Sequence, residues 1–453
     1  MKLIILLIIC TLPLKLIAQS AVAEIAVGEA SVDKDKLVID DPEVKNLDGK
    51  EKRIASEMID IIRNDFIFYK HKFNNIDYSQ KGQASYSNPS LSKWQEAGIS
   101  YFISTLVSAH GDGIEAKFKA WSVTTGKEIY SDTFRMEQRN VRPKSHTIAD
   151  AIYRSITGKP SIFNSKIVFV SDRGTNGKDT IKELYLMDFD GNRVEKLTNF
   201  RSVVISPSVA PDNSKIMFSL IASHIDRSKG RVRTIKNIDL KTYDLKTENV
   251  STVSDRPGIN SGAVFSASGE KIYLTLSFSG NADIYEMNLA SKQMRKVTSH
   301  YADDVDPSIT RDGTLMSFLS NRAGRANIYI MNPSQTEKDV KRISFVGQFN
   351  ATPRFSPDGK EIVFTSWVDG AFDLYRISAD GNNLSRLTKG FGSNEEPVYS
   401  PDGEFIVFTS KRIVSRSKAV QDVYIMNRDG EILGQLTQDF GRCFSPQWTN
   451  ILK

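Results

Sequence analysis

The side chains most often used in catalysis are sparse in this sequence and are not grouped. The five histidines lie far apart along the chain, at positions His71, His110, His146, His224 and His300. The sequence has no Gly-x-Ser-x-Gly nucleophile elbow, no His-Glu-x-x-His pair for zinc and no glycine-rich phosphate loop. We therefore expect each histidine to have a structural or surface role, and we predict no catalytic residue, no metal site and no cofactor.

The two cysteines do not predict a disulfide. Cys10 lies in an apolar N-terminal run and follows the bulky Ile9, whereas lipid attachment needs a small residue at that place. If this run is removed on export, Cys443 is the single cysteine of the mature chain. Its apolar neighbour Phe444 predicts a buried, inert thiol; the alternative for a free thiol in an exported chain is pairing between molecules.

Aspartates occur in turns at regular intervals, which indicates a repeat and not a set of ligands. Asp312, Asp358 and Asp402 each precede a glycine and are 46 and 44 residues apart. In the stretch 352–388, Asp-Gly turns and one polar Asp-Gly loop separate four short runs that have the pattern of β-strands. A unit of four strands that repeats at roughly 40–50 residues is typical of a β-propeller.

Six copies of this unit can be recognised, and the first is incomplete. That copy begins near residue 166 and lacks an innermost strand, whereas the chain ends on Phe444-Ser445-Pro446-Gln447-Trp448, the start of a unit without its continuation. We expect this C-terminal segment to supply the missing strand and so to close the ring. The predicted fold class is an α/β N-terminal domain followed by an all-β six-bladed β-propeller closed by the C-terminal strand.

Residues 1–23 have the pattern of an export signal. Lys2 precedes a short apolar run, and Ala21 and Ala23 fit the small-x-small cleavage pattern. Cleavage between Ala23 and Glu24 is therefore expected, and the mature chain would be periplasmic or otherwise exported.

The rest of the chain divides into three predicted parts. Residues 24–36 are small and charged, without a sustained period, and are expected to form an extended arm. Residues 37–160 have the pattern of an α/β domain, with an apolar stripe at helical spacing from Ala55 to Phe66 and a helix that ends at Gly158. The propeller is expected to occupy residues 161–453.

Lysine and arginine gather in two segments of the predicted propeller. One is the loop 223–236 and the other is the stretch 411–418. These clusters either keep the surface soluble or form a site for an anionic partner. The net charge of +6 falls to +4 once Lys2 and Lys15 are removed, and no nucleic-acid partner is predicted.

The two ends of the predicted ring differ in their loops. Connections between strands one and two, and between strands three and four, are short Asp-Gly turns. Connections between strands two and three, and between blades, vary in length and charge and emerge at the opposite end, where binding is expected. The candidate partner-binding residues at that end are Asn260, Asp303, Asp304, Asp306, Phe349, Asn350, Thr352, Asn394, Glu395 and Glu396. The acidic members are expected to lie on inter-blade loops and to attract a basic partner surface.

The chain resembles the TolB family, the periplasmic component of the Tol-Pal system, over essentially its whole length. The export signal, the α/β domain and a propeller that ends on Ser-Pro-x-Trp carry the resemblance. More specific are the segment 148–153 with Thr157-Gly158 at the domain junction, and the mature start Glu24-Ile25. The sequence departs from the family near Ile259, a place where the family often has a histidine.

The resemblance implies a non-catalytic, monomeric periplasmic adaptor that supports outer-membrane integrity and envelope constriction during cell division. Its propeller face would bind the peptidoglycan-associated lipoprotein Pal, and other outer-membrane lipoproteins are further candidate partners. Its N-terminal arm would bind TolA, so that association with membranes would occur only through partners. The residues of the arm that would make this contact are Glu24, Ile25, Ala26 and Val27.

Two other classes of function stay open from the sequence. A carbohydrate-binding propeller would use aromatic side chains of the loop face, for which Tyr301, Phe349 and Phe391 are candidates. An exported hydrolytic propeller would need a nucleophile or a histidine–carboxylate cluster at the channel mouth, and the scattered histidines give no support for one.

Overall fold

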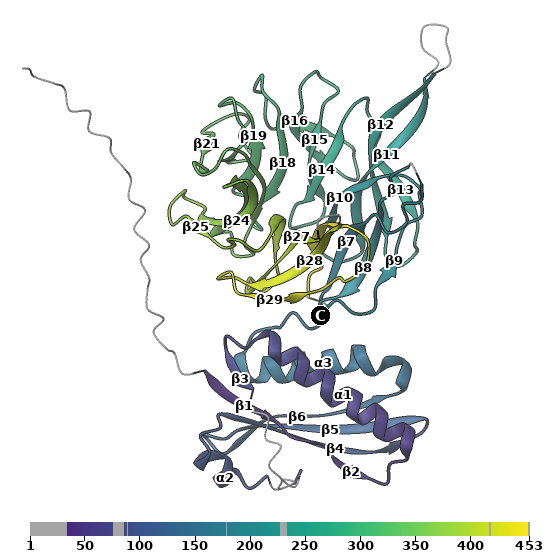
Figure 1. Cartoon of the computed structure of the whole chain (residues 1–453), viewed down its shortest axis with the longest axis vertical. Helices are drawn as coiled ribbons and strands as arrows, with labels where there is room; N and C mark the ends of the chain where they lie inside the picture. Colours follow the sequence, from purple (N-terminus) through teal and green to yellow (C-terminus); the bar gives the residue numbers. More distant parts are fainter. Residues whose placement is uncertain are drawn as a thin grey trace, which may run out of the picture.

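The computed structural model describes residues 34–75, 86–87, 89–177, 179–226, 233–415 and 418–451. The predicted signal, its cleavage at Ala23–Glu24 and the arm residues Glu24 to Val27 lie outside the described residues. The chain forms an α/β domain and a β-propeller, and the propeller stacks on the helical side of the α/β domain (Figure 1). Within the described ranges, no helix is long and apolar enough to cross a membrane.

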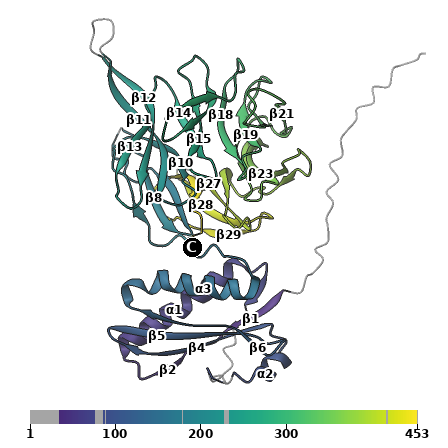
Figure 2. The same ribbon diagram turned by 180° about the vertical axis from the view of Figure 1, so that it is seen from behind.

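The α/β domain is one mixed sheet covered by two helices. The sheet has the order β3-β1-β4-β5-β6, with β2 paired to β4, and α1 and α3 lie between the sheet and the propeller (Figure 2). The elements are β1 (Asp35–Ile39), β2 (Glu43–Lys45), α1 (Gly49–Phe68), β3 (Phe73–Asn75), α2 (Leu91–Glu96), β4 (Tyr101–His110), β5 (Gly113–Ser122), β6 (Lys127–Met136), the 3₁₀ turn η1 (Gln138–Asn140) and α3 (Val141–Thr157).

Local sequence explains where the two long helices begin and end. Asp48 caps α1: its side chain accepts from the backbone N–H groups of Lys50 and Glu51, and the Glu51 side chain accepts in return from the N–H of Asp48. Every member of the predicted stripe from Ala55 to Phe66 is buried. Gly158 ends α3 in the left-handed conformation, with φ of 70°, which glycine adopts without steric cost.

The propeller consists of six four-stranded antiparallel sheets. Blade 1 is β30 (Cys443–Trp448), β7 (Lys166–Ser171), β8 (Glu183–Asp188) and β9 (Glu195–Lys196); blade 2 is β10 (Val204–Val209), β11 (Lys215–Asp226), β12 (Arg233–Asp244) and β13 (Val250–Ser254); blade 3 is β14 (Asn260–Phe265), β15 (Lys271–Leu276), β16 (Asp283–Asn288) and β17 (Met294–Lys296). Blade 4 is β18 (Asp304–Ile309), β19 (Met316–Ser320), β20 (Asn327–Met331) and β21 (Lys341–Arg342); blade 5 is β22 (Asn350–Phe355), β23 (Glu361–Val368), β24 (Ala371–Ser378) and β25 (Ser385–Arg386); blade 6 is β26 (Ser393–Tyr399), β27 (Phe405–Ser415), β28 (Lys418–Asn427) and β29 (Ile432–Gln435).

The C-terminal strand closes the ring, as predicted. Strand β30 pairs antiparallel with β7, with Cys443 opposite Ser171 and Trp448 opposite Ile167. Trp448 is only 8% exposed. Cys443 is fully buried, and burial raises the pKa of its thiol to about 12, so the expectation of an inert thiol is confirmed.

Each innermost strand bends at the same place. In all six blades the pairing register shifts after the second residue of this strand, or after the third in blade 6, which is the sign of a β-bulge. The residue at the shift has a positive φ in every blade: Ser206, Gly262, Asp306, Thr352, Glu396 and Ser445. These bulges place one side chain per blade, except for the glycine, along the central channel.

A repeated network of buried polar groups holds the third and fourth strands together. Thr388 accepts the backbone N–H of Leu374 at 2.9 Å and donates to Asp373 at 2.8 Å. Thr437 makes the same pair of bonds in blade 6 and Thr198 in blade 1. Buried donors and acceptors cost free energy when they lack partners, so this network explains the threonine that follows the fourth strand in these three blades.

Candidate partner-binding sites

The end of the propeller with uniform turns is occupied by the α/β domain. The Tyr69 hydroxyl donates to Asp402 in the Pro-Asp-Gly turn of blade 6 at 2.6 Å and accepts from the backbone N–H of Ile162 at 3.0 Å. Beside it, Lys72 Nζ donates to Glu404 at 2.8 Å and His71 Nε2 lies 3.3 Å from the same carboxylate. The His71 contact, followed by that of Lys72, lowers the pKa of Glu404 to about 2.

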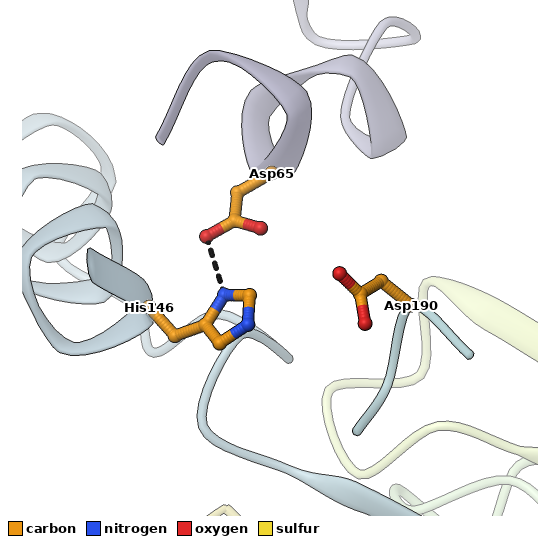
Figure 3. A group of neighbouring side chains, drawn as sticks. All are labelled: Asp65, His146 and Asp190. Atoms are coloured by element: carbon orange, nitrogen blue, oxygen red, sulfur yellow. Dashed lines mark hydrogen bonds and ion pairs between the residues drawn. The ribbon is translucent and has the colours of Figure 1, made fainter. Parts of the chain in front are cut away.

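A second polar cluster lies at the same junction and contains the one set of potential metal ligands found among the described residues (Figure 3). His146 Nδ1 lies 2.8 Å from Asp65, whose pKa burial raises to about 6. Asp190, from the turn after β8, already pairs with Arg142 of α3. A metal ion would have to compete with this guanidinium, so the cluster is best explained as a contact between the domains.

Four of the predicted partner-binding residues are buried inside their blades. The four residues are each at most 1% exposed, and each is the first or second residue of an innermost strand and not part of a loop: Asn260, Asp304, Asn350 and Asn394. Asn260 donates to the backbone carbonyls of Ile238 and Arg256. The expectation that these four lie on loops is therefore wrong, because the inner strands begin two or three residues earlier than expected.

Asp304 shows why the expected acidic field is absent there. Arg322 contacts both of its carboxylate oxygens, at 2.9 and 3.0 Å, and Arg322 also pairs with Glu337 at 2.7 Å. Burial raises the pKa of Asp304. A carboxylate that is desolvated and neutralised in this way contributes little field outside the protein.

Three further predicted residues line the central channel. Asp306, Thr352 and Glu396 border a cavity of about 260 Å³. Arg354 donates to Asp306 at 2.9 Å, and Glu396 accepts from both the N–H and the hydroxyl of Ser445 at 2.6 Å. These side chains line the channel, where Asp306 is ion-paired with Arg354 and Glu396 is hydrogen-bonded to Ser445.

The last three predicted residues are accessible at the variable end. Asp303 is exposed and lines a hollow of about 440 Å³ between blades 3 and 4, and Phe349 is 42% exposed beside Phe372. Glu395 is partly buried; burial, and then the neighbouring Glu396, raise its pKa to about 7. Of the ten predicted positions, these offer the most surface to a partner.

The comparisons with known proteins agree with this architecture. A family model described as the TolB beta propeller domain matches residues 153–366 and 347–415, which together span more than half of the chain. The chain is similar to a "Protein TolB homolog" of Chlorobium luteolum, with 28% identity over 78% of this chain and 76% of that protein. It is also similar to one of Chlorobium chlorochromatii, with 30% identity over 50% of this chain and 47% of that protein.

A solved structure extends the similarity to the fold of both domains. The crystal structure of TolB from Acinetobacter baumannii superposes with a TM-score of 0.74 and 24% identity, and the match covers 92% of this chain and 97% of that one. The sequence relatives and this fold point to the same group of proteins. The chain belongs to the TolB family.

Proposed function

We propose that the protein is a periplasmic adaptor of the Tol-Pal system that binds the lipoprotein Pal through the variable end of the propeller and TolA through its N-terminal arm. In this role it would support outer-membrane integrity and constriction of the envelope during cell division. Membership of the TolB family supports the general role. The two partners are the finer part of the proposal.

One observation carries the assignment of the Pal site. The α/β domain covers the uniform-turn end at blades 6 and 1, through the Tyr69–Asp402 and Lys72–Glu404 contacts. The opposite end is left open, and it combines loops of varied length with the channel mouth and the hollow beside Asp303. A rigid scaffold with one free face of varied loops is a common arrangement for protein recognition.

The arm proposal rests on its place in the chain and on composition. Strand β1 begins at Asp35, so residues 24–34 precede the first element of the α/β domain. Ile25 and Val27 alternate with small residues and could add a strand to an open sheet edge of TolA.

The test is capture of purified Pal and TolA domains by the mature chain. We expect the full mature chain to bind both domains, and a chain that starts at residue 35 to bind Pal but not TolA. The melting curve of the shortened chain serves as the control for folding. Absence of Pal binding by the full mature chain would contradict the adaptor function, and TolA binding by the shortened chain would place the TolA site elsewhere.

A further inference from the structure

Acidic and basic side chains are distributed unequally at the variable end of the propeller. Each of five blades has one acid in its third strand that is almost fully buried: Glu183, Asp239, Asp283, Asp373 and Asp422. They are used internally, for example by Thr388 on Asp373, so their charges are not available to a partner. The sequence therefore gives a misleading impression of acidity at this end.

Several cations at the same end are held by aromatic rings and not by acids. Arg173 lies over Phe440 with its guanidinium carbon 4.4 Å from the ring centroid, and Lys182 Nζ lies 3.4 Å from the centroid of Phe444. Arg412 lies over Phe391 at 5.0 Å. Cation–π contacts orient a side chain while its N–H donors stay free for another acceptor.

These three cations and their rings form one sector, which we name the basic sector. Arg173 and Lys182 belong to the connection between β7 and β8 of blade 1, and Arg412 belongs to β27 of the adjacent blade 6. Among the described residues, no carboxylate lies within ion-pair distance of any of the three. Arg442 and Lys411 lie close by; Arg442 pairs with the buried Asp172 at 2.6 Å.

The acids nearest the sector form no ion pair with its three cations. Glu396 is bound by Ser445, and burial raises the pKa of Glu395, which lies near Lys411. Asp439 is exposed and lies 4.0 Å from Lys418. Among the described residues, the three oriented cations therefore have no carboxylate within ion-pair distance, and Glu396 and Asp172 act on Lys182 only by longer-range attraction.

We propose that the basic sector is the docking surface for an acidic segment of the protein partner that binds the variable end. This inference rests on the proposed Pal-binding function and deepens it: the partner surface carries carboxylates, opposite in sign to the basic surface that the sequence suggested. Guanidinium groups bind carboxylates through paired hydrogen bonds, and cations already held in place lose little side-chain entropy on binding.

The geometry favours a protein segment over an anionic membrane. Lys182 is partly buried and lies near Glu396, a residue of the channel wall. The described parts of β11 and β12 rise beyond the neighbouring blades (Figure 1). A flat lipid surface would meet such a projecting hairpin first, whereas a peptide segment can reach cations at the channel mouth.

The test compares charge reversal inside and outside the sector in the full mature chain. Variant one is Arg173→Glu with Arg412→Glu. The matched control is Arg311→Glu with Lys360→Glu, two exposed cations of the turns at the other end of the propeller. Both variants change the net charge by the same amount. The probes are the soluble domain of Pal, a decaglutamate peptide and vesicles that contain phosphatidylglycerol.

We expect variant one to slow Pal association about tenfold or more at low salt, and the control to change it less than about twofold, because local rim charges act mainly on association rate. The milder pair Arg173→Gln with Arg412→Gln should give an intermediate effect and keeps the test valid if variant one folds poorly. Equal rates for variant one and the control would overturn the proposal. Loss of vesicle binding without loss of peptide or Pal binding would overturn it in favour of a membrane.

The measurement with decaglutamate distinguishes failure of this proposal from failure of the proposed Pal-binding function. If Pal does not bind the wild-type chain but the peptide does, and variant one loses the peptide, the basic sector stands and the Pal assignment falls. If Pal binds both chains equally and the peptide binds neither, the Pal assignment stands and the basic sector falls.

Discussion

Replacing Glu404 by glutamine should weaken the junction between the two domains. The carboxylate is 23% exposed, accepts from Lys72 and lies against His71. Its pKa is about 2 in the folded protein against an ordinary 4.5, a difference that corresponds to about 3 kcal/mol of stabilisation. Because glutamine can keep one hydrogen bond to Lys72, we expect Glu404→Gln to cost about 1–3 kcal/mol at pH 7.

The assay is calorimetric unfolding of the mature chain, which reports whether the two domains melt together. The matched control is Glu431→Gln. Glu431 pairs with Lys70 across the same junction at 2.7 Å, but its side chain is 51% exposed. Exposed ion pairs contribute about 0–1 kcal/mol, so the control should melt close to the wild type, whereas Glu404→Gln should lower the transition or split it in two.

The pH dependence gives an independent check. A carboxylate whose pKa is lowered by folding stabilises the folded state above its unfolded pKa, and this contribution is lost as pH falls through the folded value. The difference between wild type and Glu404→Gln should therefore be complete above about pH 5 and shrink towards pH 2. Equal melting of the two proteins at pH 7, or a difference as large at pH 3 as at pH 7, would refute the reasoning.

Three further changes probe other parts of the molecule. Deleting residues 444–453 should open the ring. Because the buried Trp448 is lost, the free energy of unfolding should fall by about 3–5 kcal/mol or more, and a melting temperature within two degrees of the wild type would contradict closure. Thr388→Val should cost about 1–3 kcal/mol in chemical denaturation, because the backbone N–H of Leu374 loses its acceptor and Asp373 loses one of its donors, whereas Asp303→Asn on the surface should be nearly neutral. Deleting residues 24–34 should leave the melting curve unchanged while abolishing TolA capture, and an earlier melt would show that the arm contributes to the fold.

The propeller fold could be predicted because the pattern of one four-stranded unit recurs six times in the sequence. Alternating apolar residues and Asp-Gly turns recur at nearly constant spacing. The strands expected for blades 3 to 6 therefore lie close to the observed ones. The closing strand could be predicted because the first unit lacks an inner strand and the last segment of the chain has the pattern of an inner strand without a continuation. The α/β domain was recognisable because the stripe from Ala55 to Phe66 has one helical period.

The site was harder because adjacent residues of a strand face opposite sides. Asp303 is exposed and Asp304 is fully buried, although the sequence offers them as an equivalent pair. A displacement of one residue reverses which side chain reaches solvent. The bulge two residues later then turns Asp306 into the channel. No pattern in a single sequence marks the position of that bulge.

The same reasoning explains why the charge of the variable end could not be read from composition. Each blade needs a hydrogen-bond acceptor in its third strand, and in five blades an acid fills this place. Acids are therefore drawn into the interior by the repeat itself, where some of them pair with lysine or arginine, as Asp283 does with Lys296, while other cations lie on rings such as Phe440 and Phe444. A chain of small net charge can in this way present a strongly basic face. If Asp373→Asn, which removes only an internal charge, leaves Pal association unchanged while Arg173→Glu with Arg412→Glu slows it, the recognition field comes from the outer cations alone; a change in association rate with Asp373→Asn would show that the buried acids also act on the partner.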